Sequence, residues 1–399
     1  MDTYDIVVVG GGYSGMTAVD RIAAHRPSVR VALVDGKDEF VERIRLHEAA
    51  AGHERKVFRY EPHLKAIGAG FMQGRVESID TGASRLRIAG ADGSRHDWAY
   101  RHLILALGSR TNKAVIPGIA EHAVCLDGVE DAAELARWAL GGGRLLVIGG
   151  GLTSFESVAE FAETFPSLRV TLVSAATLAP SDAPGGYSAA AVDYLRRTFQ
   201  RLNVQFLENT PVQKLQAGRA VLAGGEVIEF DRCIWAGGFS VSDLPQRAGI
   251  AVGKGGRIAC TPTLQSVSHP QIIATGDIAE VNAEPSGVCR MSCAAGRPMG
   301  EAAAASALAL LDGAKPAAFH FAFTFRCISL GRQDGLIQFV DVMDRPLAEV
   351  WTGARAARWK EYVCSRTVAG VGLTAAVEPP DTPPVALNSQ QALKQLQKA

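Results

Sequence analysis

Two glycine-rich segments, each preceded by a short apolar run, constrain most strongly what this chain can fold into. The first fills every glycine position of a G-x-G-x-x-G pattern, with Gly10, Gly12 and Gly15. The second keeps two of these glycines, Gly149 and Gly151, and has another residue at the third position. A loop of this kind between a strand and a helix binds the pyrophosphate of one dinucleotide. Two such loops predict two dinucleotides brought face to face, the arrangement in which a nicotinamide passes hydride to a flavin.

The residues around the first loop predict a complete nucleotide-binding unit. Residues 6–9 are apolar and β-branched, as in a strand buried within a parallel sheet. The next helix begins near Ser14 and directs free N–H groups and the positive end of its dipole at phosphates. A second predicted strand, residues 31–34, ends at Asp35, at the spacing where a carboxylate accepts hydrogen bonds from an adenosine ribose. The alternative is a glycine-rich turn in another kind of α/β protein.

The second loop is less complete than the first. Ser154 takes the third glycine position, and its side chain is small enough to let the helix pack. The following predicted strand, residues 170–173, ends at Ser174. This strand end offers no acid for a ribose 2′-hydroxyl and no arginine for a 2′-phosphate, so the choice between NADH and NADPH stays open. A degenerate unit that no longer binds a nucleotide is the alternative.

Composition excludes several classes of function. Basic and acidic residues number 41 each, so charge gives no reason to expect nucleic acid or an anionic membrane as a partner. No apolar run reaches the ~20 residues of a membrane span, and the early first strand leaves no room for a signal peptide. Seven scattered cysteines fit a reducing cytoplasm. Only Cys289 and Cys293 are close; we expect apolar filler, with a redox pair as the alternative, and no metal site.

The order of the predicted elements divides the chain into three domains and a tail. The predicted fold class is α/β, with two Rossmann-like domains in three layers and a C-terminal α+β domain. The first nucleotide domain comprises residues 1–119 and 243–312, and the second comprises residues 120–242. Residues 313–376 contain three strand signals and a basic helix. Residues 377–399 form a proline-rich linker and a tail that ends in a short helical pattern.

Further segments are expected to return the chain to the nucleotides. Strands at 102–110 and 233–238 end in small residues, where backbone approaches a ligand closely. Asp277 follows a glycine at a strand end and is placed to bond a polyol hydroxyl, with a helix N-cap as the alternative role. The alanine-rich stretch 293–311 predicts a long helix. If its N-terminus faces a flavin, the helix dipole stabilises the negative charge of the reduced ring.

These features together resemble the two-dinucleotide-binding flavoprotein family, also known as pyridine nucleotide-disulfide oxidoreductases. In that family an FAD domain is interrupted by an NAD(P) domain and followed by a C-terminal domain. The disulfide reductases carry a cysteine pair where this chain has residues 38–52 without cysteine, which disfavours thiol–disulfide exchange. Segments 154–161, 290–300 and 323–339 are similar to type II NADH:quinone oxidoreductases, and among them to the AIF-like ferroptosis-suppressor quinone reductases.

The resemblance implies an FAD-dependent NAD(P)H oxidoreductase that passes electrons to a small-molecule acceptor such as a quinone. It places Glu156 between nicotinamide and flavin as the catalytic residue, the alternative being an ordinary acid on a helix surface. It also implies that Val76 contacts adenine through its backbone. The residues predicted to bind the two cofactors are Gly10, Gly12, Tyr13, Ser14, Gly15, Asp35, Lys37, Arg43, Val76, Ala106, Gly108, Gly149, Gly151, Leu152, Thr153, Gly237, Gly276, Asp277 and Ala294.

Two differences from the respiratory enzymes keep alternatives open. Where those enzymes carry glutamines on the flavin-facing helix, this chain has residues 294–298, with the sequence AAGRP. Its C-terminal segment, with Leu393 and Leu396, is a weak amphipathic pattern. We therefore expect a cytoplasmic protein, with peripheral binding at the inner face of the membrane and a homodimer left open. The alternatives in function are a reductase for a ferredoxin or oxygenase partner and an AIF-like, non-enzymatic NAD(P)H-binding flavoprotein.

Overall fold

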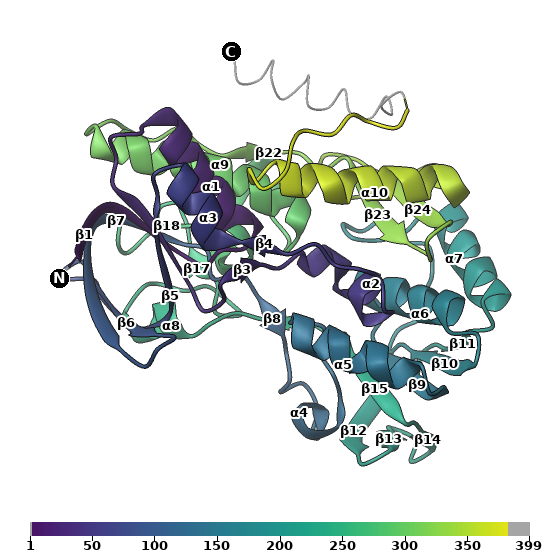
Figure 1. Ribbon diagram of the computed structural model, residues 1–399. Helices are drawn as coiled ribbons and strands as arrows, with labels where there is room; N and C mark the ends of the chain where they lie inside the picture. The colour runs from purple at the N-terminus through teal and green to yellow at the C-terminus, as the bar shows by residue number, and fades with distance from the viewer. Residues whose placement is uncertain (1, 382–399) are drawn as a thin grey trace.

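The computed structural model describes residues 2–381, and its architecture is shown in Figure 1. The predicted helix in the tail, residues 389–399, lies outside the described residues. The first glycine loop follows the central strand of a sheet in which β1 pairs in parallel with β2 on one side and β7 on the other. The strands of this sheet are β1 (Asp2–Val9), β2 (Val31–Asp35), β5 (Gly70–Asp80), β6 (Arg85–Gly90), β7 (Arg95–Leu105) and β18 (Ile272–Ala274).

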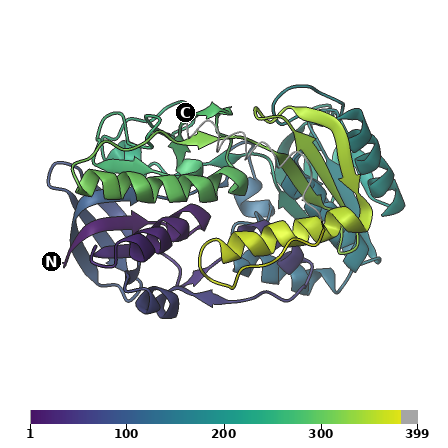
Figure 2. The same ribbon diagram turned by 90° about the horizontal axis from the view of Figure 1, so that it is seen from above.

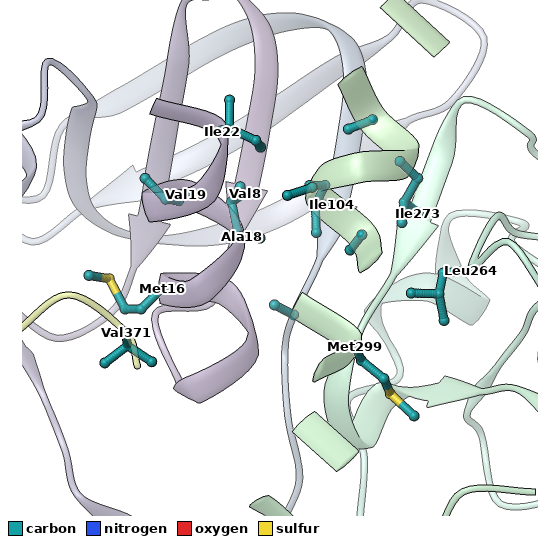
Figure 3. Close-up of a cluster of buried hydrophobic side chains, with 14 of the residues drawn as sticks. Val8, Met16, Ala18, Val19, Ile22, Ile104, Leu264, Ile273, Met299 and Val371 are labelled. Carbon is teal, nitrogen blue, oxygen red and sulfur yellow. The ribbon is translucent and has the colours of Figure 1, made fainter. Parts of the chain in front are cut away.

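Strand β1 is buried on both faces because its alternate side chains enter two different cores. Val8 packs with Ile104 and Ile273 against the helices α1 (Tyr13–His25) and α9 (Cys293–Leu311), as Figure 3 shows. On the opposite face, Val7 and Val9 join a second core with side chains of β7, β18 and the short helix α8 (Leu244–Arg247). Figure 2 shows α9 running alongside α1, and both helices contribute side chains to the same core.

A second parallel sheet contains the strand that precedes the second glycine loop. Its order is β11-β10-β9-β15, all in parallel. Helix α6 (Leu152–Thr164) follows the loop and packs against this sheet, and its residues 154–161 are buried on all sides. The strands of this sheet and of the small antiparallel sheet beneath it are β9 (Gly143–Ile148), β10 (Leu168–Val173), β11 (Gln205–Leu207), β15 (Arg232–Trp235), β12 (Val212–Gln216), β13 (Arg219–Leu222) and β14 (Val227–Glu229).

The chain crosses between the two parallel sheets as an antiparallel pair, β8 (Arg110–Thr111) with β16 (Phe239–Ser240). A third, antiparallel sheet follows near the C-terminus, in the order β23-β24-β25. Helix α10 (Gly353–Ala369) covers it through a small core that includes Phe339 and Trp359. The three strands are β23 (Phe325–Ser329), β24 (Gly335–Val340) and β25 (Pro346–Thr352).

The remaining elements include two longer helices, α5 and α7, and otherwise short helices and strands. They are β3 (Glu39–Phe40), η1 (Arg43–Arg45), α2 (Leu46–Ala50), β4 (Phe58–Arg59), α3 (Tyr60–Ala66), α4 (Ile119–His122), α5 (Val129–Ala139), α7 (Ala189–Arg201), β17 (Ile258–Ala259), η2 (Gly276–Ile278), β19 (Ala279–Glu280), β20 (Asn282–Pro285), β21 (Gly287–Val288) and β22 (His320–Phe321). This mixed architecture confirms the predicted fold class. The predicted domain boundaries stay predictions.

Most predicted elements agree with the observed ones, and the long helix 293–311 agrees at both ends. The strand expected at 102–110 is wrong in its bounds, because β7 begins at Arg95 and ends at Leu105. Its first half pairs with β6 as a hairpin, and its second half enters the parallel sheet. The hairpin half of β7 is largely polar, so the pattern of apolar residues indicated only the second half of the strand.

Candidate active site

The glycines of the first loop have two different structural roles. Gly10 has a φ of +105°, and a Cβ there would overlap the carbonyl of Ala106, so the residue that follows strand β7 lies directly against it. A Cβ on Gly15 would overlap the Gly10 carbonyl oxygen. Gly12, by contrast, would meet nothing within 4 Å. Two glycines thus close the turn, and the third leaves open space at the N-terminus of α1, where a pyrophosphate fits.

Asp35, at the end of β2, is connected to the same loop. Its carboxylate accepts a hydrogen bond from the Gly11 N–H at 2.6 Å and one from the Lys37 N–H at 2.8 Å. Burial raises the pKa of Asp35, while these two N–H groups and the charge of Lys37 oppose the rise. The carboxylate therefore lies at the loop, where the spacing predicted a ribose contact.

Tyr60, at the start of α3, is part of the first loop's support and was missed by the sequence analysis. Its hydroxyl donates a hydrogen bond to the Gly11 carbonyl at 2.7 Å, and the ring is buried. A Cβ on Gly11 would lie 2.5 Å from this hydroxyl. No motif marks Tyr60, because 49 residues separate it from the loop that it supports.

Asp277 joins a polar cluster at the carboxyl ends of β7 and β18. Its carboxylate accepts a hydrogen bond from the Ser109 hydroxyl at 2.6 Å. The Arg43 guanidinium donates to the Ser109 carbonyl and to Asp127, the latter at 2.9 Å. Gly276 has a φ of +72° next to Asp277. The structure thus brings Arg43 and Asp277 together, as a set of polar groups facing one strand end.

Asp277 is not the N-cap of the long helix. It lies within the short helix η2, and Ser292 occupies the N-cap position of α9. The second residue of α9, Ala294, is exposed, whereas Ala295 and Gly296 behind it are buried. The helix N-terminus therefore presents a small exposed residue, which leaves its N–H groups accessible to a ring placed there.

The second loop repeats the geometry of the first with one change. Gly149 has a φ of +150°, and a Cβ there would overlap the hydroxyl of Ser154. Gly151, the N-cap of α6, would meet nothing within 4 Å, so Leu152 and Thr153 begin the helix beside open space. The nearby Gly237 lies against the ring of Trp235, which would lie 2.6 Å from a Cβ at that position. This loop can therefore also receive a pyrophosphate.

At the end of β10, Ser174 occupies the position where an acid stands in the first unit. Its hydroxyl donates to the Ala176 carbonyl at 2.8 Å and accepts from the Ala176 N–H at 3.3 Å. A Cβ on Gly150 would lie 2.7 Å from this hydroxyl. Ser174 thus forms a local turn close to the loop and supplies no charge.

Glu156 is buried and paired with a cation from the third sheet. Its carboxylate lies 2.8 Å from the Lys360 ammonium on α10 and accepts a hydrogen bond from the Ser329 N–H at 3.1 Å. The Nδ1 atom of His47 on α2 lies 3.9 Å from its second oxygen. The alternative reading of Glu156 as an ordinary surface acid is therefore wrong, because its side chain is buried where α6, α10 and α2 meet.

Electrostatics keep this pair ionised. Burial alone raises the pKa of Glu156, but Lys360, His47 and the Ser329 N–H outweigh it, so its pKa falls below the usual value. Burial alone lowers the pKa of Lys360, and Glu156 outweighs it, so that pKa lies well above its usual value. A buried charge is stable only when it is paired and hydrogen-bonded in this way.

Three further residues predicted to bind the cofactors are Val76, Gly108 and Tyr13. Val76 lies on β5, three residues beyond Gln73, which pairs with Asp35 across the sheet. Gly108 has a φ of +64° and open space beside it. Tyr13 is the first residue of α1, and its ring packs edge-on against Phe40.

Cys289 and Cys293 are free thiols, as are the other five cysteines of the chain. Burial raises the pKa of Cys293 to about 11 and also raises the pKa of Cys289. Both thiols are therefore protonated at neutral pH and poorly nucleophilic, as expected for apolar filler.

This architecture, with two glycine loops on two parallel sheets and a buried charge pair on the helix that follows the second loop, is typical of α/β proteins that bind two nucleotides. The family model described as pyridine nucleotide-disulphide oxidoreductase matches residues 4–306. The chain therefore belongs to the pyridine nucleotide-disulphide oxidoreductase family, and the resemblance stated from its residues is confirmed.

Known proteins similar to this chain agree with that assignment. An NADH dehydrogenase-like protein of Mycobacterium tuberculosis is 27% identical over 320 residues, covering 74% of this chain and 78% of the relative. A type II NADH:quinone oxidoreductase of Staphylococcus aureus is 25% identical over 93% of this chain and 96% of its own length. The sulfide:quinone oxidoreductase of Aquifex aeolicus shares the fold, with a TM-score of 0.77 at 16% identity, covering 100% of this chain and 96% of that structure.

Among residues 2–381, no helix combines the length and the apolar character that a membrane span requires.

Proposed function

We propose that this protein is an FAD-dependent oxidoreductase that accepts hydride from NADH or NADPH and passes electrons to a quinone-like acceptor. The first nucleotide domain, residues 1–119 and 243–312, would hold FAD, and residues 120–242 would hold the nicotinamide cofactor. FAD supplies a carrier that takes a hydride and releases electrons. The names of the relatives, an NADH dehydrogenase-like protein and a type II NADH:quinone oxidoreductase, support this chemistry.

One observation carries the proposal. Each sheet ends in a glycine loop with open space at a helix N-terminus, at Gly12 and at Gly151. Because both loops lie at the carboxyl ends of parallel strands, each can hold a pyrophosphate. Glu156, which forms an ionised pair with Lys360, lies about one helical turn after the second loop. It supplies fixed charge where the nicotinamide is expected, and preorganised charge of this kind orients reactants.

Anaerobic titration of the purified protein tests the proposal directly. We expect a yellow protein whose flavin absorbance is bleached by NADH, by NADPH or by both, and restored by a water-soluble quinone. The rates of bleaching by NADH and by NADPH identify the hydride donor, because the uncharged Ser174 does not select between the two. A colourless protein that takes up no added FAD would overturn the assignment of the first domain. A flavin that neither nucleotide bleaches would overturn the assignment of the second.

Substitution of Glu156 tests its role within this scheme. Glu156→Gln keeps the size and the hydrogen-bond acceptor and removes the negative charge beside Lys360. We expect flavin to remain bound and the rate of its reduction by NADH to fall by about 100- to 1,000-fold, the range that loss of one preorganised electrostatic group produces. Stopped-flow absorbance measures this rate. A rate within twofold of wild type would remove Glu156 from the site.

A further inference from the structure

His47 lies between two carboxylates and is the starting point of this inference. It is the second residue of α2, and only 4% of its surface is exposed. Its Nδ1 atom lies 3.9 Å from Glu156, and its Nε2 atom lies 3.9 Å from Glu48. Among the described residues, Nε2 has no hydrogen-bond partner. Both ring nitrogens therefore face an acid at a distance that a small movement or one water molecule closes.

Glu48 connects His47 to solvent. It lines a pocket of about 560 Å³ at the junction of α2, α10 and the β23–β24 loop. Arg332 on the same wall lies 3.1 Å from the Glu48 carboxylate and holds it in place. Lys360 also borders the pocket. The pocket is therefore separated from Glu156 by Lys360 on one side and by Glu48 and His47 on the other.

Burial, more than the charged groups around it, keeps the His47 ring neutral. Burial lowers its pKa, Glu156 on α6 and Glu48 on α2 raise it, and Lys360 on α10 and Arg332 on the β23–β24 loop lower it. The net direction is downward, so the ring is neutral at neutral pH. A neutral imidazole carries a proton on one nitrogen and accepts one on the other, which is the property that a proton carrier needs.

The reaction proposed above, on which this inference rests, requires a proton from solvent. NADH gives up a hydride, which contains two electrons and one proton. A quinone becomes a quinol by taking two electrons and two protons. NADH, quinone and one proton therefore yield NAD⁺ and quinol, and that one proton must reach a buried site in every turnover.

We propose that His47 is the residue that carries this proton from the pocket to the Glu156–Lys360 pair. Water in the pocket protonates Glu48, His47 accepts the proton at Nε2, and His47 releases the proton on Nδ1 to Glu156. Glu156 passes this proton to Lys360 after the Lys360 ammonium has given up its own proton towards the bound cofactor, so the ionised pair is restored. Each step moves one proton between neighbouring groups and transfers no electrons.

The test separates proton delivery from hydride transfer. In His47→Gln, flavin content and the rate of flavin reduction by NADH should stay within about twofold of wild type. Turnover with a water-soluble benzoquinone should fall by about 100-fold or more, as loss of a proton-transfer group predicts. Uptake of the proton, followed with a pH indicator dye, should slow by the same factor. His102→Gln is the matched control, since His102 is a half-buried histidine on β7 whose pKa burial also lowers.

Two further measurements distinguish proton transfer from a packing role. Added imidazole should restore turnover in His47→Ala, because a small base can enter the space left by the ring. Nitrogen NMR of labelled histidine should show the His47 pKa falling further in Glu48→Gln and in Glu156→Gln, since both acids raise it in the wild type. The NMR measurement requires no turnover.

Direct protonation of Lys360 by pocket water is the competing route. Unchanged quinone turnover and proton uptake in His47→Gln would establish that route and overturn this proposal. Failure of imidazole to restore His47→Ala, or a His47 pKa indifferent to both acids, would also overturn it. A wild-type flavin that neither NADH nor NADPH bleaches would overturn the proposed function itself, and that result is distinct from normal bleaching with unaltered proton uptake.

Discussion

The two glycine loops of this molecule have the same strand–loop–helix geometry and differ in what surrounds it. The first is enclosed by backbone: Gly10 lies against Ala106, Gly15 against Gly10, and Asp35 binds the loop N–H. The second tolerates Ser154 where the first requires a glycine and has the uncharged Ser174 at its strand end. The first loop is therefore suited to a tightly held group, and the second to a nucleotide that exchanges in every turnover.

The helices that follow the loops differ in the same way. Helix α1 packs on α9 through small residues, and a Cβ on Gly300 would overlap the Ser14 carbonyl. Helix α6 instead buries two carboxylates, Glu156 and Glu160, which are paired with cations from the C-terminal part of the chain. The first unit is thus a rigid frame built by close packing. The second places charge where chemistry is expected.

The largest effect should come from filling the third glycine position of the first loop. Gly15→Ala places a Cβ on the Gly10 carbonyl, so we expect loss of bound flavin and a fall of about 3 kcal/mol in the free energy of unfolding, as for severe overpacking. Thermal unfolding and flavin absorbance measure both quantities. Gly12→Ala is the control, because its Cβ enters open space. It should fold normally and lose flavin only.

Glu160 should give the helix of the second loop a pH-dependent stability. Burial raises the pKa of Glu160 to about 7 from 4.5, against the opposing effect of Arg332. Because the folded-state pKa is higher, this contribution is fully present below about pH 4.5 and is lost as the pH rises through about 7, by at most about 3 kcal/mol. Urea unfolding at several pH values should show a flatter profile for Glu160→Gln. If the free energy of unfolding changed equally with pH in wild type and in Glu160→Gln, the raised pKa of Glu160 would be contradicted.

Asp35 should give a smaller effect, confined to the first loop. Asp35→Ala leaves the Gly11 N–H without its acceptor and removes the predicted ribose contact. We expect flavin retention to weaken by about 10- to 100-fold, the cost of one or two hydrogen bonds to a charged group. Asp35→Asn keeps an acceptor and should lose less. Equal flavin content in all three proteins after gel filtration would remove Asp35 from the site.

The contrast between the loops also shows what the sequence could predict. Both loops, their strands and the long helix 293–311 follow from local patterns, because glycine spacing and apolar periodicity are properties of neighbouring residues. Glu156 was found only through a resemblance to a family. Its burial could not be predicted from α6 alone, since the helix continues with Glu160 and Glu163 and resembles an exposed acidic face.

The partners of these residues come from distant parts of the chain and carry no local signal. Lys360 lies in a helix rich in basic residues, and in the sequence nothing distinguishes it from Arg358 or Arg366. Only the folded chain brings its ammonium to Glu156 on α6. His47 and Tyr60 lie in a segment for which the sequence pattern predicted no helix or strand. Their roles depend on tertiary contacts, which a single sequence does not encode in any short pattern.

The smallest effect should come from the serine that distinguishes the second loop. In the part of the chain that the structure describes, the buried Ser154 hydroxyl has no hydrogen-bond partner. Ser154→Ala removes an unsatisfied polar group and should change the free energy of unfolding by less than about 1 kcal/mol, towards greater stability. The dissociation constant of NADH or NADPH, measured by fluorescence quenching, should change by less than about twofold, because the loop N–H groups at Gly151 are retained. A tenfold weakening would show that the hydroxyl itself binds the nucleotide. Ser154 would then contribute directly to nucleotide binding, and would not be only a small residue that the packing of the second loop accepts.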